Sequence, residues 1–175
     1  MCINAKLSKM NLKLKNISDE EDRDKKSFLA LVNLTDRSRD ENPLTVKSMH
    51  SFNPHEIEYL KYLIEGIMNH PAKTLGQTSA LNAISQVKAK KLGVMDAEQI
   101  LGKFKEHKWL IVNGDQVRFH PRFIAEMEMW LKDMYPEQVN TCSSCQKLVL
   151  KCLRCPNESC EAGNDNFSLT CNFRG

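Results

Sequence analysis

Apolar residues recur with helical periodicity along residues 53–135, and this stretch is the best organised part of the chain. Asn53 is a good N-cap, Pro54 suits the first helical position, and His70-Pro71 closes the segment. The apolar positions of this segment are Ile57, Leu60, Ile64, Ile67 and Met68. The pattern therefore predicts a first helix between Asn53 and Pro71.

Two further helices are predicted in the same stretch. A short helix is expected over residues 78–84, with Thr78 or Ser79 as its cap, and a third helix is expected to be capped by Asp96. The third helix has one apolar face, which consists of Ala97, Ile100, Leu101 and Phe104. The chain thus offers three helices in succession.

A β-hairpin is predicted directly after the third helix. The runs WLIV (109–112) and VRF (117–119) flank Asn113-Gly114-Asp115, and an Asn-Gly pair between two apolar strands is a strong hairpin signal. Three helices followed by a β-hairpin is the order of a winged helix, with the hairpin as its wing. We therefore predict a winged-helix domain over residues 53–136.

A fourth helix is predicted to begin at Pro121 and to end at Pro136. Its apolar residues form one continuous stripe of Phe123, Ile124, Met127, Trp130, Leu131 and Met134. The stripe is longer than a small core needs, so part of it is a candidate surface for a partner protein. The candidates are Phe123, Met127, Trp130 and Met134. The alternative is that the whole stripe packs against the domain's own helices.

Residues 1–36 carry a weaker β pattern. LKLK (12–15) and FLALVNL (28–34) alternate like strands, and DEEDRDKK (19–26) between them is too polar to bury. The pattern predicts two strands joined by a solvated loop. Because a two-stranded hairpin is not stable alone, we interpret residues 1–36 as the remnant of a first winged helix, its last helix and wing. A polar linker over 37–52 follows.

Composition and charge narrow the possible functions. The chain has 175 residues, of which 41% are hydrophobic, enough for a globular core with appendages. Its net charge of +3 comes from 25 basic and 22 acidic residues, and this near balance does not by itself indicate nucleic acid. No apolar run is long enough to span a bilayer and no signal-peptide pattern opens the chain, so we expect no membrane association.

Five of the seven cysteines lie between residues 142 and 160. The pairs Cys142-x-x-Cys145 and Cys152-x-x-Cys155 each place two thiolates on one side of a tight turn. Two such pairs can offer four sulfurs at tetrahedral corners, about 2.3 Å from a zinc ion. Metal binding would also supply folding energy to a segment with few large apolar residues. We therefore predict a zinc module over residues 140–175.

Other interpretations of the cysteines stay open. The thiols could be unligated, or one pair could do thioredoxin-like redox work, although no βαβ pattern surrounds either pair. Cys160 and Cys171 are further candidate ligands. Six ligands suffice for one zinc ion and fall short of the eight that two tetrahedral ions need.

A lysine cluster before the third helix makes DNA binding the alternative function. It consists of Lys88, Lys90 and Lys91. The third helix would lie in the groove if the domain bound DNA, yet it also carries acidic residues, and each of these subtracts from the attraction to phosphate. The sequence has no nucleophile elbow, phosphate-binding glycine loop or His-Glu-x-x-His helix, so we expect no side chain that makes or breaks bonds itself.

Three sequence blocks resemble a known family. They are FLALVNL, DAEQILGKFKEHKWLIVNGDQVRFHPRFIAEMEMWLKDMYP and CSSCQKLVLKCLRC. Together they resemble the first non-SMC element of the SMC five/six chromosome-maintenance complex, a nuclear genome-repair assembly. The middle block is the specific one, because it matches in order, in spacing and in the placing of Trp109. The cysteine block alone would indicate only zinc.

The resemblance implies a helix-rich α+β fold with two tandem winged helices and a C-terminal variant RING finger. It also implies a MAGE-type and a kleisin-type partner subunit, DNA repair and recombination in the nucleus, and RING-type ubiquitin transfer with a ubiquitin-conjugating enzyme. The family's first four zinc ligands match Cys142, Cys145, Cys152 and Cys155. Cys160 falls where the family has a histidine, and the family's final Cys-x-x-Cys is absent.

The incomplete ring changes what we expect of this chain. In a cross-braced ring the second and fourth ligand pairs share an ion, so loss of the fourth pair leaves Cys152 and Cys155 without partners. The module would then close both turns on one zinc or stay partly open. Ser143 and Ser144 stand where a RING ligase usually has an aliphatic residue for docking a conjugating enzyme. We therefore expect weak or no autonomous ligase activity, and a role as a protein-interaction subunit.

Overall fold

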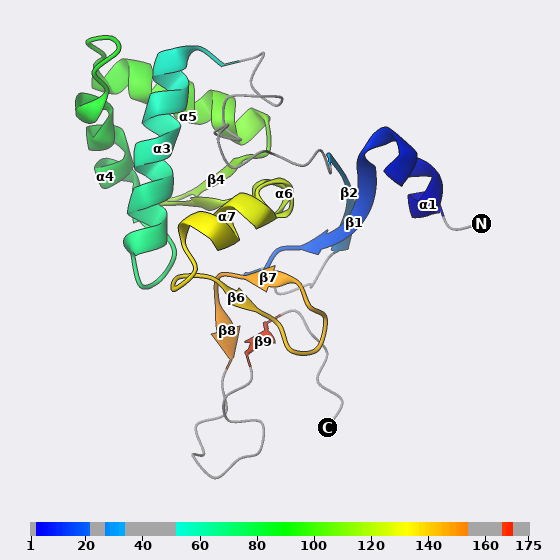
Figure 1. The fold of residues 1–175 in the computed structure, drawn as a ribbon. Helices are drawn as coiled ribbons and strands as arrows, with labels where there is room; N and C mark the ends of the chain where they lie inside the picture. The colour runs from blue at the N-terminus through cyan, green and yellow to red at the C-terminus, as the bar shows by residue number, and fades with distance from the viewer. Residues whose placement is uncertain (1–2, 22–26, 34–51, 154–165, 170–175) are drawn as a thin grey trace. The chain divides into compact units, whose positions relative to one another are not determined.

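The computed structural model describes residues 3–21, 27–33, 52–153 and 166–169, and these form a mixed α+β fold (Figure 1). They fall into two compact units. The terminal unit is drawn from Met1–Leu34 and Ile124–Gly175, and the central unit from Thr35–Phe123. The N-terminal hairpin and the cysteine-rich tail therefore belong to the same unit although they lie far apart in sequence. None of the described helices is both long and apolar enough to cross a lipid bilayer.

The described part of the central unit begins with α3 (Pro54–Asn69), α4 (Gln77–Asn82) and α5 (Val94–Glu106). α3 confirms the predicted first helix. The Glu56 carboxylate accepts a hydrogen bond of 2.8 Å from the Asn53 N–H and completes a capping box. The predicted cap of the second helix is wrong, because Gly76 is the N-cap of α4 and Thr78 and Ser79 lie inside the helix.

The start of α5 also differs from the prediction. Gly93 is its N-cap, so Asp96 lies in the first turn of the helix. The Asp96 carboxylate accepts a hydrogen bond of 2.7 Å from the Gly93 N–H. Because glycine has no side chain, only the half of a capping box that the Asp96 carboxylate makes is present, and an acidic residue three places into a helix can be taken for the cap itself. The predicted apolar face is buried, and it consists of Ala97, Ile100, Leu101 and Phe104.

The predicted hairpin forms as β4 (Leu110–Asn113) and β5 (Gln116–Phe119). Asn113 pairs with Gln116 across the turn. Gly114 has a φ of 59°, a left-handed conformation that glycine adopts at little cost. The short strand β3 (Leu75–Gly76) pairs with the other edge of β5, so the sheet order is β3-β5-β4.

Aromatic side chains form the core of the central unit. The buried ring of Phe104 lies 5.2 Å from that of Phe52 and 6.4 Å from that of Tyr59, centre to centre. The Tyr59 hydroxyl donates a hydrogen bond of 2.7 Å to the Ala80 carbonyl, and burial raises the pKa of this hydroxyl. The cluster joins α3 and α5 through contacts that only large side chains can make.

The terminal unit starts with α1 (Ile3–Leu7), a 3-10 turn (Ser8–Met10), β1 (Leu12–Ser18) and β2 (Ser27–Asn33). β1 and β2 form the predicted antiparallel hairpin, in which Leu14 pairs with Leu31. Asn4 fixes α1 to β1, because its side chain accepts a hydrogen bond of 2.9 Å from the Leu14 N–H and donates one of 3.3 Å to the Leu14 carbonyl.

The predicted fourth helix is in fact two helices, α6 (Pro121–Glu126) and α7 (Glu128–Met134). The chain leaves the helical conformation at Met127, which has φ −102° and ψ 11°. The apolar stripe is therefore not continuous as predicted, because the break interrupts the helical repeat. The predicted end of the helix before Pro136 is confirmed.

Lys15 of β1 ties the hairpin to the chain around α7. Its Nζ donates hydrogen bonds to the Ala125 carbonyl at 3.2 Å and to Glu128 Oε2 at 2.6 Å, and Lys132 donates to Glu128 Oε1 at 2.9 Å. Burial alone would raise the pKa of the Glu128 carboxyl, but the hydrogen bonds and charges of the two lysines outweigh it and lower the pKa. Glu128 is thus held ionised between two cations.

Replacement of Glu128 by glutamine is expected to destabilise the chain at neutral pH by about 1–2 kcal/mol, since charge-assisted hydrogen bonds are lost. A carboxyl whose folded pKa lies below its ordinary 4.5 stabilises the fold above that pH. This contribution is lost as the pH falls through the folded pKa. Denaturant unfolding of wild type and Glu128→Gln between pH 3 and pH 7 should therefore show a difference that shrinks on acidification. The exposed Glu137→Gln serves as control, and a gap independent of pH would contradict the ionised pairing.

Candidate functional site

Cys142 and Cys145 lie on a tight turn between the short strands β6 (Asn140–Thr141) and β7 (Leu148–Val149). The Cys142 N–H donates to the Lys147 carbonyl and the Gln146 N–H donates to the Cys142 carbonyl, both at 2.9 Å. Gln146 has a φ of 59°, which lets the chain reverse directly after Cys145. The turn predicted from the Cys-x-x-Cys spacing is confirmed, with Cys142 buried and Cys145 exposed.

Cys152 opens β8 (Cys152–Leu153), which pairs with β9 (Phe167–Ser168). Its thiol donates a hydrogen bond of 3.3 Å to Asn166 Oδ1. The Asn166 carbonyl in turn accepts a hydrogen bond of 2.8 Å from the Ser143 N–H. Asn166 therefore links the sulfur of Cys152 to the Cys142–Cys145 turn, a contact that sequence reasoning did not find.

The donor chemistry fits zinc, since thiolates on tight turns are its usual structural ligands. Cys142, Cys145 and Cys152 are the predicted ligands among the described residues. The other three, Cys155, Cys160 and Cys171, lie outside them. Within the described ranges, no group of three or more His, Cys, Asp or Glu side chains is gathered closely enough to hold a metal ion.

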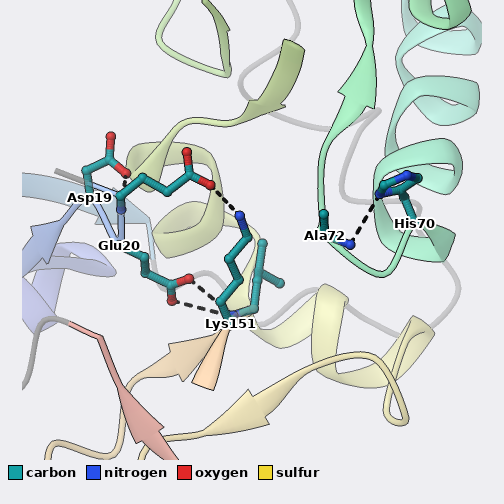
Figure 2. Close-up of polar contacts among 7 residues, drawn as sticks. Asp19, Glu20, His70, Ala72 and Lys151 are labelled. Atoms are coloured by element: carbon teal, nitrogen blue, oxygen red, sulfur yellow. Dashed lines mark hydrogen bonds and ion pairs between the residues drawn. The ribbon is translucent and has the colours of Figure 1, made fainter. Parts of the chain in front are cut away.

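Acidic residues that follow β1 bind the segment between the Cys142–Cys145 turn and Cys152 (Figure 2). Glu20 accepts hydrogen bonds from the Leu150 N–H at 3.3 Å and from the Lys151 N–H at 3.2 Å. The Lys151 ammonium pairs with Glu21, and Asp19 Oδ1 accepts a hydrogen bond of 3.0 Å from the Glu21 N–H. The prediction that this loop is simply solvated is wrong for Glu20, which caps two amides of a distant segment.

The Glu20 carboxyl has a strongly altered pKa. Burial raises the pKa to about 7, and the hydrogen bonds from the Lys151 and Leu150 amides offset only part of this rise. A carboxyl in this setting is costly to ionise. Of the carboxyls in the described residues whose pKa is clearly shifted, Glu20 is the one whose pKa is raised, whereas those of Glu58 and Glu128 are lowered.

The predicted partner-binding residues are divided between core and surface. Phe123 is buried with its ring 5.7 Å from that of Trp109, and Met127 is also buried. These two therefore pack within the fold, as the plain alternative had it. Trp130 is half-buried beside the ring of Tyr135, at 5.9 Å.

The exposed apolar side chains of α7 are Met129, 72% exposed, and Met134, 59% exposed. Met129 did not belong to the predicted stripe, because it lies two residues after Met127 and so falls outside the apolar face of a continuous helix. We call Met129, Trp130 and Met134 the α7 surface. Its methionines are flexible and polarizable, which suits contact with another protein.

The three lysines of the DNA alternative are exposed in the segment before α5. The Glu58 carboxylate accepts hydrogen bonds from the Lys88 N–H at 3.0 Å and the Ala89 N–H at 3.1 Å, and these bonds lower its pKa. On α5 itself, Lys103 pairs with Glu56 at 2.8 Å. One of the basic groups of the third helix is therefore already neutralised.

Comparison with known proteins gives a consistent result. Residues 1–92 match a family model described as the Nse1 non-SMC component of the SMC5-6 complex. The human protein named non-structural maintenance of chromosomes element 1 homolog is 30% identical over 97% of this chain and 59% of its own length. Element 1 of Saccharomyces cerevisiae is 28% identical over 79% of this chain and 48% of its own length. The chain thus spans about three fifths of the human relative.

A solved structure shows the same fold. A chain in the structure of an Nse1-Nse3-Nse4 complex matches with a TM-score of 0.73 and 27% sequence identity. The match covers 97% of this chain and 68% of that chain. Both compact units described above therefore have counterparts in a single known chain.

Proposed function

Because the chain belongs to the family of Nse1 non-SMC components of the SMC5-6 complex, as its sequence blocks predicted, we propose that it is a protein-interaction subunit of such a complex. Its place of work is then the nucleus, and its process is DNA repair and recombination. The absence of a side-chain constellation for covalent chemistry in the sequence supports a role in positioning other proteins.

The partners proposed for this chain are counterparts of Nse3 and Nse4, which we expect to be a MAGE-type and a kleisin-type subunit. The observation that carries this proposal is the match to a chain of the Nse1-Nse3-Nse4 complex over 97% of the present chain. In the central unit, α3, α4 and α5 precede the β4–β5 hairpin, and this order supports the winged helix predicted over 53–136. Winged helices serve protein contacts as well as DNA.

We expect the MAGE-type subunit to dock on the α7 surface, and substitutions of its exposed methionines test this. The double variant Met129→Ser, Met134→Ser is expected to weaken co-purification, with a dissociation constant raised about tenfold or more, as for central contacts of an interface. Titration calorimetry with the purified partner measures the effect.

The matched control for this test is Met95→Ser. Met95 lies on α5 and is 71% exposed, similar to Met129. We expect Met95→Ser to leave the affinity within about twofold, in line with near-neutral rim positions. Equal affinities for wild type and the α7 double variant would show that the partner binds elsewhere on this chain.

For the cysteine module we propose one structural zinc ion and an accessory part in RING-type ubiquitin transfer. The confirmed turn at Cys142 and Cys145, and the link from this turn to Cys152 through Asn166, support a metal-binding module. When bound, zinc would fix the ligand segments rather than take part in a reaction. Ser143 and Ser144 are exposed on the turn and offer no apolar contact to a ubiquitin-conjugating enzyme. Transfer would therefore depend on the partner subunit.

Direct DNA binding is the second candidate function. The exposure of Lys88, Lys90 and Lys91 on one segment favours it, whereas the pairing of Lys103 with Glu56 and the exposed acids of α5 oppose it. If this function holds, the triple alanine variant should abolish binding to duplex DNA, and wild-type affinity should fall steeply with salt. Wild-type chain that shows no mobility shift at low salt would exclude it.

A further inference from the structure

We propose that Glu20 is a positioning residue for the cysteine module. Its carboxylate fixes the backbone directly before Cys152 and thereby sets where the Cys152 sulfur lies relative to the Cys142–Cys145 turn. The inference rests on the zinc site proposed above and adds to it a residue from the opposite end of the chain.

The geometry of Glu20 is that of a two-pronged clamp (Figure 2). Oε1 accepts from the Leu150 N–H at 3.3 Å and Oε2 accepts from the Lys151 N–H at 3.2 Å. In its ionised form, which prevails above pH 7, the carboxylate has two acceptor oxygens and no donor, so it can serve two adjacent N–H groups at once. An amide side chain of the same size can serve only one of them.

The clamped segment is short and well packed. It joins β7 to β8, and Leu148, Val149 and Leu150 are all buried. Amides beside buried side chains have little access to water, so an amide released by Glu20 would lose its partner without replacement. The loop that carries Glu20 is itself shaped by the hydrogen bond from the Glu21 N–H to Asp19.

Cys152 follows the clamped amides directly, so it is held from two sides. Its backbone continues from Lys151, whose amide is bound by Glu20, and its sulfur reaches Asn166 at 3.3 Å. Asn166 in turn accepts from Ser143 in the first turn. A displacement of Lys151 would therefore move the sulfur away from the Cys142–Cys145 turn. Mutation of a residue that orients a metal ligand commonly lowers the metal affinity about 10- to 100-fold.

The test uses Glu20→Gln in the full chain at about pH 8, where the wild-type carboxyl is ionised. Gln keeps the size of the side chain but turns one of the two acceptors into a donor that faces an N–H group. We expect zinc affinity, measured by competition with a chromogenic chelator, to fall about tenfold or more. In the metal-free chain, we expect Cys152 to be alkylated faster relative to Cys142 than in wild type, as read by mass spectrometry. This ratio would not change if Glu20 contributed only to overall stability.

The matched control is Glu21→Gln, the same change one residue further on. It removes the ion pair with the Lys151 ammonium and leaves both amide bonds in place. We expect its zinc affinity and alkylation ratio to stay within about twofold of wild type, as for an exposed pair. Equal zinc affinity in Glu20→Gln and Glu21→Gln would overturn the positioning role.

Two further outcomes separate this inference from the proposed function. If the wild-type chain takes up no zinc, the proposed zinc site is wrong, and the alkylation ratio alone then tests the positioning role of Glu20. A ratio in Glu20→Gln equal to that of wild type overturns this role. If Glu20→Gln does not fold, hydrogen exchange of the wild-type chain decides. We expect the Leu150 and Lys151 amides to exchange at least about a hundredfold more slowly than that of the exposed Ser144. Equal exchange rates would overturn the clamp.

Discussion

Removal of zinc is expected to cost the cysteine module most of its folding free energy. Structural zinc sites contribute apparent binding free energies of about 10–16 kcal/mol at neutral pH, comparable with the whole stability of a small domain. The described strands of this module are two residues long. Such short strands cannot support a fold without a cross-link. Titration with a strong chelator should release the thiols to a colorimetric reagent while the near-ultraviolet signal of the buried Trp109 in the central unit persists.

Cys142→Ser should reproduce the effect of the chelator, because it removes the buried thiol of the first turn. Cys2→Ser is the matched control, since Cys2 stands far from the other cysteines in sequence. Equilibrium dialysis with metal analysis should give one zinc per chain for wild type and Cys2→Ser, and none for Cys142→Ser. Two tightly held ions in wild type would contradict the single site, and none would contradict metal binding.

Phe104→Ala is expected to destabilise the central unit by about 3–5 kcal/mol. Phe104 is fully buried, and its ring contacts those of Phe52 and Tyr59. Alanine leaves a cavity between α3 and α5 that neighbouring aromatic rings cannot fill, because rigid rings do not collapse into small voids. Denaturant unfolding followed by tryptophan fluorescence measures the loss.

Phe28→Ala is the matched control for this core substitution. Phe28 is the same residue type on β2, with 54% of its surface exposed. We expect a change within about 0.5 kcal/mol, as for surface positions that carry no special contact. A loss of stability as large as that of Phe104→Ala would show that the β1–β2 hairpin carries an equally important core.

The elements of the central unit could be predicted because their signals are local. Asn53-Pro54 marks the start of α3 and Asn113-Gly114 marks the β4–β5 turn, and both signals act within about four residues along the chain. The Cys142–Cys145 turn is predicted for the same reason. Membership of the family was likewise present in the sequence, through blocks that extend over most of the chain.

The position of the α7 surface could not be predicted in the same way. The helical repeat placed Phe123 and Met134 on the same apolar stripe, yet Phe123 is buried and Met134 is exposed. A hydrophobic stripe indicates a face, but whether another element covers that face depends on the packing of the whole chain. Met129, which the helical repeat did not place on the stripe, is exposed as well.

The sequence by itself determined the place of α3, α4 and α5, the two hairpins, the cysteine turn and the family, since each depends on neighbouring residues or on long matched blocks. Only the tertiary structure decided that Glu20 meets Leu150 and Lys151. Glu20 lies in a run of charges that looks solvated, and its partner Leu150 is 130 residues away. Two backbone amides carry no side-chain signal in a sequence, so their need for a carboxylate becomes visible only when the chain has brought them together.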